Sequence, residues 1–189
     1  GESPIEAAIL PSGFPFLDLL PADRDLVGVE VEFVGLERWE EVLGARLAAI
    51  AERYDFILID CPPSLGHLTI LALVAATGVL IPLQCEYFAL EGVSELLSTI
   101  RRVTSALNPE LELAGILLTM YDDRMKLTRD VEREVREHFL AQVFEADVPR
   151  NVRLAEAPSH GLSILHYDIK SRGAEAYLAV ARELLRRTR

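Results

Sequence analysis

Short runs of consecutive apolar residues alternate along this chain with stretches that are apolar on one helical face only. The predicted strands are Phe16–Leu20, Phe56–Ile59, Gly78–Leu83, Ala114–Met120, Val143–Val148 and Ser163–Leu165. Strands that are apolar at successive positions are typical of parallel sheets covered by helices on both faces. The alternation therefore predicts an α/β fold with a mainly parallel sheet flanked by helices.

Four segments between and after these strands carry apolar residues at helical spacing. The stripes are Trp39, Val42, Leu43, Leu47 and Ile50; Val93, Leu96, Leu97, Ile100 and Leu107; Leu127, Val131, Val135 and Phe139; and Tyr177, Leu178, Ala181, Leu184 and Leu185. Each stripe predicts a helix with one buried face. Asn108 and Pro109 predict the end of the second helix. The chain shows no repeat and no low-complexity linker, so we expect a single domain over residues 1–189.

The composition is that of a soluble globular protein, with 50% hydrophobic and 26% charged residues. The sequence shows neither a membrane-length apolar run nor a signal peptide. Cys61 and Cys85 predict two semi-buried free thiols in a reducing cytosol, with a metal or iron–sulfur ligand pair as the alternative. His160 and His166 form no metal-spaced cluster with the cysteines, and we interpret both as non-catalytic.

The net charge of −11 is unevenly distributed along the chain. Residues 1–60 carry a net charge of −9 and residues 61–149 a net charge of −6, whereas residues 150–189 carry +4. The whole-chain charge argues against nucleic-acid binding, but the basic C-terminal part could still face phosphate groups.

One carboxylate directly follows an apolar run in YDFILIDCPPSLG (residues 54–66). A carboxylate at the carboxyl end of a strand can hold Mg²⁺, usually through a water molecule, close to a bound phosphate. Asp60 is such a candidate, and a simple turn cap is the alternative. Nucleotide hydrolases with this feature also need a phosphate-binding loop of the form G-x-x-x-x-G-K-[ST]. The two lysines, Lys126 and Lys170, follow Met125 and Ile169, so neither belongs to such a loop.

Five segments match the ParA/Soj family of partitioning ATPases in order and spacing. They are DCPPSLG (60–66), PLQCEYFALEG (82–92), GILLTMYD (115–122), VPRNVRLAEAPSHG (148–161) and SRGAEAY (171–177). The chain resembles that family from about Phe16 to Arg187. The resemblance implies a deviant-Walker P-loop NTPase-like fold that uses ATP and Mg²⁺. It further implies a cytoplasmic, nucleoid-associated protein that forms a homodimer around ATP, binds double-stranded DNA without sequence preference, uses a ParB-like partner and needs no membrane.

The resemblance also assigns roles to individual positions. It implies that Asp60 is the Walker B carboxylate that holds Mg²⁺, and it implies a nucleotide wall, a dimer face and DNA contacts. The nucleotide wall consists of Thr119, Met120, Pro149, Arg150, Asn151 and Val152, the dimer face of Gln84, Glu86 and Tyr87, and the DNA contacts of Arg124 and Arg153. Lys126, Lys170 and Arg172 join the DNA set by charge alone.

Physical chemistry adds modest support for the DNA contacts. Arg150 and Arg153 would share one face if residues 150–157 are helical, and ordinary solvated arginines are the alternative. Binding to any duplex sequence needs only a few phosphate contacts per subunit, doubled by dimerisation. The sequence contains no aromatic stripe for stacking single-stranded bases.

The family pattern implies that a first strand, a P-loop, a first helix and a second strand precede Gly1. The chain begins with Gly1-Glu2 rather than methionine, so we expect residue 1 not to be the translation start. The P-loop strand would lie between the strands Phe56–Ile59 and Gly78–Leu83. Three outcomes are open: the native chain carries this segment, the two flanking strands pair directly, or another chain supplies the strand. No catalytic residue is assigned within the chain, and we expect the chain alone neither to bind ATP tightly nor to hydrolyse it.

Two other functions remain open. The chain could be a non-catalytic ParA-like binding or regulatory module, or a MinD-like membrane-cycling ATPase with a membrane-seeking last helix. Leu178, Leu184 and Leu185 with the terminal arginines favour a core-packed last helix. The sequence does not specify the cargo, whether chromosome, plasmid or protein cluster, or the identity of a ParB-like partner.

Overall fold

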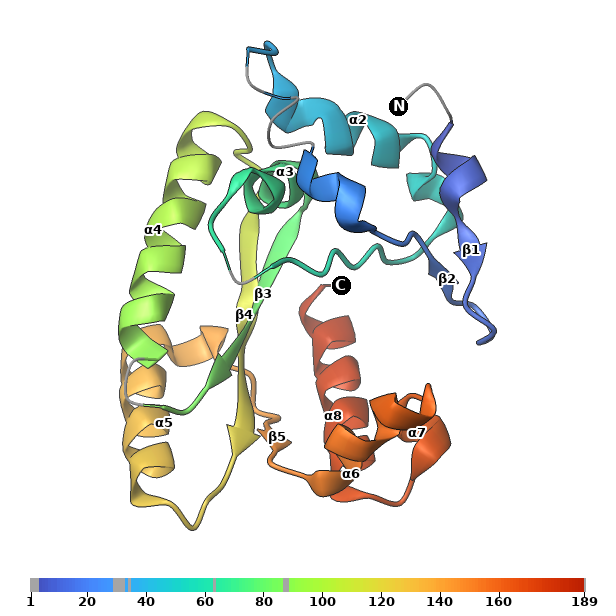
Figure 1. Ribbon diagram of the computed structural model, residues 1–189. Helices are drawn as coiled ribbons and strands as arrows, with labels where there is room; N and C mark the ends of the chain where they lie inside the picture. The colour runs from blue at the N-terminus through green and yellow to red at the C-terminus, as the bar shows by residue number, and fades with distance from the viewer. Residues whose placement is uncertain (1–3, 29–32, 34, 63, 87–88, 189) are drawn as a thin grey trace. The chain divides into compact units, whose positions relative to one another are not determined.

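The computed structural model describes residues 4–28, 33, 35–62, 64–86 and 89–188. The chain forms two compact units (Figure 1). The first unit comprises Gly1–Thr77 and Thr99–Leu111, and the second comprises Gly78–Ser98 and Glu112–Arg189. The expectation of a single domain over residues 1–189 stays a prediction.

The first unit consists of short helical turns, a two-stranded antiparallel pair and two helices. Its elements are η1 (Ile5–Ala8), β1 (Leu10–Pro11), β2 (Asp18–Leu19), η2 (Arg24–Gly28), η3 (Trp39–Glu41), α2 (Val42–Ala48), η4 (Ala51–Arg53) and α3 (His67–Ala75). Leu10 lies opposite Leu19, so the predicted strand Phe16–Leu20 is confirmed only at its centre. The predicted helix from Trp39 to Ile50 corresponds to η3 and α2.

The predicted strand Phe56–Ile59 is wrong. These residues are extended but belong to no strand, and the Leu58 side chain is 82% exposed. A parallel strand is defined by hydrogen bonds to a neighbour, and within the described part of the chain this run forms no ladder with another strand. Asp60 therefore follows an extended apolar segment that pairs with no strand among the described residues.

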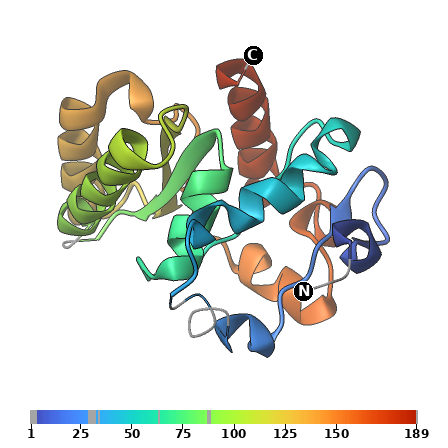
Figure 2. The same ribbon diagram turned by 90° about the horizontal axis from the view of Figure 1, so that it is seen from above.

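The second unit is built on a parallel three-stranded sheet of order β3-β4-β5. Its strands are β3 (Gly78–Gln84), β4 (Glu112–Tyr121) and β5 (Val148–Pro149). Its longer helices are α4 (Ala89–Ala106, shared with the first unit), α5 (Lys126–Phe139) and α8 (Arg172–Arg187). Its short helical elements are η5 (Leu140–Gln142), α6 (Val152–Glu156), η6 (Ala157–His160) and α7 (Ile164–Tyr167). The predicted parallel α/β architecture with flanking helices is confirmed. Helices α4 and α5 lie on one side of the strands and α8 on the other (Figures 1 and 2).

Two strand predictions in the second half of the chain need correction. Within Val143–Val148, only an isolated bridge between Val143 and Ile116 and the end residue Val148 are paired. Ser163–Leu165 is not a strand, because Ile164 begins helix α7 and buries its side chain against Ala157 and Ala174. Three residues are too few to show whether an apolar pattern repeats every two or every 3.6 residues.

The last helix, α8, packs only in part through its predicted stripe, of which Leu184 contacts the core cluster around Leu117 and Phe144. Its buried residues are Gly173, Ala174, Val180 and Glu183, whereas Tyr177 and Leu185 are exposed. Val180 packs with Leu117 of β4, with Phe144 and with Val148 of β5. Helix α8 therefore holds the segment that leads into β5, and so the position of the residues that follow that strand.

Gly115 of β4 allows the closest approach within this core. A Cβ atom at this position would lie 2.4 Å from Cε2 of Phe144, whose side chain is 0% exposed, and 2.9 Å from the Gln142 carbonyl oxygen. We expect Gly115→Ala to lower the free energy of unfolding by about 3 kcal/mol, because neither neighbour can move away freely. Urea unfolding measures the change. Gly78→Ala is the matched control, since its Cβ would meet Ala114 at an ordinary 3.5 Å, and an equal loss in both variants would contradict the packing argument.

A buried ion pair fixes the same segment to α8. The Glu183 carboxylate, in a residue that is 4% exposed, accepts hydrogen bonds from the backbone amides of Glu145 at 2.9 Å and Ala146 at 3.0 Å. Arg187 donates to this carboxylate at 2.7 Å, to the Val143 carbonyl oxygen at 2.8 Å, and lies over the Phe144 ring. Burial alone raises the pKa of Glu183, but the two amides and the guanidinium outweigh burial and leave this pKa below its usual range.

This ion pair predicts an acid-sensitive contribution to stability. Because the folded-state pKa of Glu183 is lowered, the stabilisation is complete above the unfolded pKa of about 4.3 and is lost as the pH falls through the folded-state value. We expect Glu183→Gln to lower the free energy of unfolding by about 2 kcal/mol at pH 7 and to weaken its dependence on acid pH. Urea unfolding across the acid range measures both effects. Glu175→Gln, exposed on the same helix, should change neither.

Candidate functional site

The carboxyl ends of three parallel strands meet at one edge of the second unit. Gln84, the last residue of β3, lies opposite Thr119 of β4, and Thr119 lies opposite Val148 of β5. One step further, Tyr121 lies opposite Pro149. This carboxyl edge is where parallel α/β sheets bind ligands.

Most residues of the predicted nucleotide wall and dimer face converge at the carboxyl edge. A cavity of about 60 Å³ there is lined by Gln84, Cys85, Glu86, Met120, Met125, Leu127, Thr128 and Arg150. Thr119 and Pro149 flank it through the strand register. The structure therefore brings Thr119, Met120, Pro149 and Arg150 together with Gln84 and Glu86. Tyr87 lies outside the described residues.

Local backbone geometry sets the direction in which this edge presents its side chains. Met120 has a φ of 51°, in the left-handed region that non-glycine residues rarely adopt, and is 45% exposed. The Arg150 backbone amide donates to the Tyr121 carbonyl oxygen at 3.0 Å, which ties the end of β5 to the end of β4. Left-handed residues that the surrounding structure holds in place are concentrated at functional sites.

Helix α6 begins directly at this edge. The Asn151 side chain accepts a hydrogen bond from the Arg153 backbone amide at 2.8 Å and so caps the helix, and Val152 is its 72%-exposed first residue. Arg150 precedes the helix, which corrects the expectation that it shares a helical face with Arg153.

A group of titratable side chains that was not predicted from the sequence belongs to the same edge. The Tyr121 hydroxyl donates to Glu132 of α5, which also pairs with Arg136 at 2.8 Å. The hydrogen bond to Glu132 raises the pKa of Tyr121 to about 12, and burial raises the pKa of the Cys85 thiol to about 11. Both groups therefore stay protonated at neutral pH, which suits a structural support and not a nucleophile. The spacing of Glu132 and Arg136 was a usable signal for this pair, but its contact with Tyr121 depends on tertiary packing.

The cysteines are free, as predicted, but differ in their surroundings. Cys85 is buried and Cys61 is exposed, so the expectation of two semi-buried thiols is wrong for Cys61. Among the described residues, no group of three or more histidine, cysteine, aspartate or glutamate side chains could hold a metal ion.

Arg124 and Arg153, the two arginines that the resemblance assigns to DNA, each form ion pairs. Arg124 pairs with Asp122 at 2.7 Å, and its hydrogen bonds lower the pKa of Asp122 to about 2. Arg153 pairs with Glu156 at 2.9 Å and with Asp168 at 3.5 Å. The remaining members of the set, Lys126, Lys170 and Arg172, are all exposed. The basic set is thus accessible, and Arg124 and Arg153 are paired with acidic neighbours.

Asp60 belongs to the first unit and is exposed at the end of the extended segment Phe56–Ile59. An exposed carboxylate fits Mg²⁺, which keeps several of its waters and takes one or two protein oxygens together with substrate phosphates.

The helices in the described part of the chain are all too short or too polar to cross a membrane.

Known proteins similar to this chain are partitioning proteins and nucleotide-binding proteins. A family model described as an AAA domain matches residues 1–113. The chain is 53% identical over 186 residues to the chromosome partitioning protein ParA of Myxococcus xanthus. The matched residues make up 98% of this chain and 66% of that relative. It is 52% identical over 168 residues to the sporulation initiation inhibitor protein Soj of Bacillus subtilis, with 89% and 66% covered.

A solved structure shares the fold. Cobyrinic acid a,c-diamide synthase from Mycobacterium smegmatis, with bound ADP and magnesium, superposes with a TM-score of 0.81 at 36% identity, over 98% of this chain and 68% of that one. This structural similarity agrees with the predicted P-loop NTPase-like fold. The sequence identities to the ParA and Soj proteins are far higher than those between proteins that share only a fold. The chain belongs to the ParA/Soj family of chromosome-partitioning ATPases.

Proposed function

We propose that this chain acts in a ParA-type partitioning protein, an ATP-switched dimer that binds DNA without sequence preference and moves DNA cargo with a ParB-like partner. The observation that carries the proposal is the convergence of Thr119, Met120, Pro149 and Arg150 with Gln84 at the carboxyl edge. The chain around them is 53% identical to a ParA protein. The cytoplasm and the nucleoid are the location that this function requires.

The carboxyl edge offers the groups that an adenine base needs. Met120 and Pro149 present apolar surface for the faces of the base, while Thr119 and Arg150 offer polar groups at its rim. The cavity of about 60 Å³ is too small for a nucleotide, since small-molecule sites have volumes of roughly 300–1,000 Å³. The base therefore binds on the open side of the edge, where Met120 and Arg150 are exposed, next to Asn151 and Val152 at the start of α6.

Asp60 would supply the carboxylate that holds Mg²⁺, as the resemblance to the family implies. The bound ion would neutralise charge on the phosphates of ATP during hydrolysis. The printed sequence contains no G-x-x-x-x-G-K-[ST] loop, so hydrolysis needs phosphate-binding groups beyond those of this chain. Gln84, Glu86 and Tyr87 are assigned to the face that a second copy meets when ATP is bound.

The basic set Arg124, Lys126, Arg153, Lys170 and Arg172 supplies the phosphate contacts for DNA. Exposed ion pairs stabilise a protein by only about 0–1 kcal/mol, so DNA phosphates can replace Glu156 beside Arg153. The Arg124 side chain is 85% exposed, although that of its partner Asp122 is only 14% exposed. Dimerisation doubles the number of contacts per DNA segment. No contact to base edges is needed for this function.

The test uses a ParA chimera. In it, this chain replaces the matching part of the Myxococcus xanthus ParA, and the rest of that protein is kept in its own order. Fluorescence anisotropy with two duplexes of unrelated sequence should show equal affinities with ATP and Mg²⁺, and much weaker binding with ADP. Binding to only one of the duplexes, or binding that ignores the nucleotide, would refute the proposed switch. A chimera that binds DNA but does not hydrolyse ATP would favour the non-catalytic module.

A further inference from the structure

Two carboxylates converge on the guanidinium group of Arg153 in the second unit. Arg153 Nη1 donates to Glu156 Oε2 at 2.9 Å, and Arg153 Nε lies 3.5 Å from Asp168 Oδ2. Glu156 ends α6 and Asp168 follows α7, two short helices that lie side by side (Figure 1). The three residues form the Arg153 cluster. It holds one cation and two carboxylates, although Arg153 belongs to the basic set.

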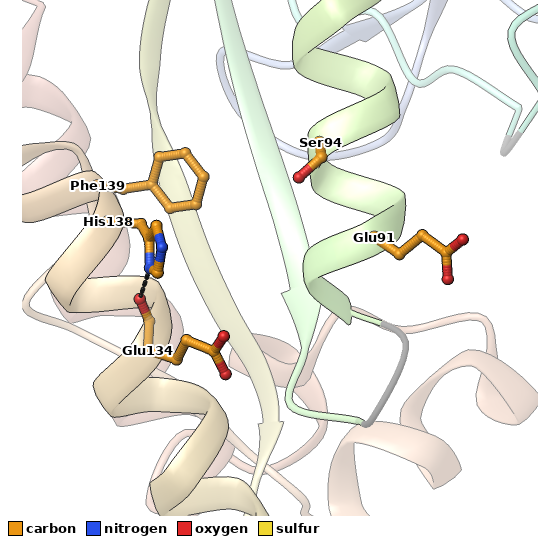
Figure 3. A pocket seen from close by; sticks show the side chains of 5 residues that line it. All are labelled: Glu91, Ser94, Glu134, His138 and Phe139. Atoms are coloured by element: carbon orange, nitrogen blue, oxygen red, sulfur yellow. Dashed lines mark hydrogen bonds between the residues drawn. The ribbon is translucent and has the colours of Figure 1, made fainter.

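Convergence on one cation distinguishes the Arg153 cluster from the groove between α4 and α5. That groove has a volume of about 270 Å³ and is lined by Glu91, Ser94, Glu134, His138 and Phe139 (Figure 3). The Glu91 side chain points away from Glu134, so the two carboxylates of the groove do not form one site. In the Arg153 cluster, both carboxylates contact the same guanidinium group.

The Glu156 carboxylate is held from a second direction. The Tyr167 hydroxyl donates to the same oxygen, Oε2, at 3.1 Å. Tyr167 is partly buried, packs against the core cluster that contains Ile164, and stacks with the His160 ring. The hydrogen bonds from Arg153 and then from Tyr167 lower the pKa of Glu156 below its usual range. Glu156 is therefore charged at neutral pH and oriented toward Arg153.

Asp168 is fixed by the backbone that leads into α8. Its Oδ1 atom accepts from the Lys170 backbone amide at 3.2 Å, and its carbonyl oxygen accepts from the Ser171 hydroxyl at 2.7 Å. The 3.5 Å between Asp168 Oδ2 and Arg153 Nε is longer than an ordinary hydrogen bond. Glu156 makes the shorter contact, and so it is the main restraint on the Arg153 side chain.

We propose that Glu156 is an autoinhibitory contact that restrains Arg153 and so lowers the affinity of the protein for DNA. The inference rests on the proposed function, in which Arg153 contacts a DNA phosphate. A guanidinium group pairs with phosphate through two neighbouring nitrogens, either Nε with Nη2 or Nη1 with Nη2. Asp168 lies at Nε and Glu156 at Nη1, so each of these pairs has one nitrogen beside a carboxylate. A phosphate group must therefore compete with a fixed anion.

The exposure of the ion pair makes this competition reversible. The Arg153 side chain is 54% exposed and that of Glu156 is 40% exposed, so a phosphate group can reach both. Exposed ion pairs are weak, and the restraint on DNA binding is accordingly moderate. Weak DNA contacts suit a protein that must leave its DNA again.

The test measures DNA binding by the ParA chimera with ATP and Mg²⁺ by fluorescence anisotropy. We expect Glu156→Gln to raise the affinity about five-fold, since each dimer loses two exposed ion pairs. The slope of log K against log salt concentration should stay the same, because the number of phosphate contacts is unchanged. Glu175→Gln is the matched control. It removes the same charge from an exposed position one helical turn after Arg172 and should change the affinity less than about two-fold.

Two further variants show whether the gain passes through Arg153. Glu156→Gln should give no gain in the Arg153→Ala background, because the restrained side chain is then absent. Tyr167→Phe keeps every charge and removes only the hydrogen bond to Glu156 Oε2, so it should raise the affinity about two-fold. No gain in Glu156→Gln, an equal gain in Glu175→Gln, or the same gain with and without Arg153 would each overturn the proposal.

The same measurements separate this inference from the proposed function. If the unaltered chimera binds DNA only with ATP, and Arg153→Ala weakens binding but Glu156→Gln does not strengthen it, the function stands and the autoinhibitory contact is refuted. If the unaltered chimera binds no DNA, the proposed function is refuted and the inference with it.

Discussion

Replacing Asp60 by asparagine in the ParA chimera is expected to lower kcat for ATP hydrolysis about 100-fold, a loss of about 2.7 kcal/mol of transition-state stabilisation. The reason is that, in the proposed function, Asp60 would hold Mg²⁺, and the ion would supply charge neutralisation at the transferring phosphate. Asparagine keeps the size and the hydrogen-bonding capacity of the side chain but removes its charge. Steady-state release of phosphate at saturating ATP and Mg²⁺ measures the effect.

Two controls separate this role from a general effect of charge. Asp55→Asn removes an equal charge from an exposed position in the same segment and should leave kcat unchanged. The 189-residue chain without the added residues should release phosphate no faster than buffer with ATP and Mg²⁺, because it has no lysine that follows a glycine-rich loop. Turnover by the chain alone, or equal losses at Asp55 and Asp60, would contradict the role assigned to Asp60.

Replacing Arg153 by alanine is expected to weaken DNA binding by the ATP-bound chimera at least ten-fold at low salt. Each dimer loses two phosphate contacts, so the slope of log K against log salt concentration should become less steep by about 1.8. The cost of releasing Arg153 from Glu156 and Asp168 is small, because all three side chains are exposed by a third or more. Anisotropy titrations over a range of salt concentrations measure both quantities.

Arg133→Ala is the matched variant for this prediction. Arg133 is also an exposed arginine in an ion pair, with Asp130 at 2.9 Å, but it lies outside the basic set. Its removal changes the net charge equally and should leave the salt slope unchanged. The assignment of Arg153 to the DNA face would be wrong if both variants lost affinity equally, or if neither did.

The two long strands of the sheet were predictable from their apolar sequence. Whether a short apolar segment forms a strand depends on a neighbouring strand and was not predictable. Gly78–Gln84 and Glu112–Tyr121 form the two long paired strands of the sheet, and each places apolar side chains on both faces. Phe56–Ile59 has the same local character but forms no strand. A strand needs a hydrogen-bonding neighbour, and a sequence pattern does not show whether one is present.

The carboxyl edge was predictable for a topological reason. Parallel strands end on the same side of a sheet, so segments that follow Leu83, Met120 and Val148 must meet there. The support beneath this edge was not predictable, because Tyr121 with Glu132, and Glu183 with the amides of Glu145 and Ala146, join residues that lie far apart in the sequence. The exposure of Cys61 and the pairing of Arg153 with Asp168 depend on tertiary structure in the same way.

Photolabelling with azido-ATP most directly tests whether the carboxyl edge is a nucleotide wall. The ParA chimera would be labelled in the presence of Mg²⁺ and digested, and the modified peptides identified by mass spectrometry. We predict labels on residues 119–121 or 149–152, abolished by excess unlabelled ATP. Competable labels found only on other segments of the chain would contradict the proposed nucleotide site.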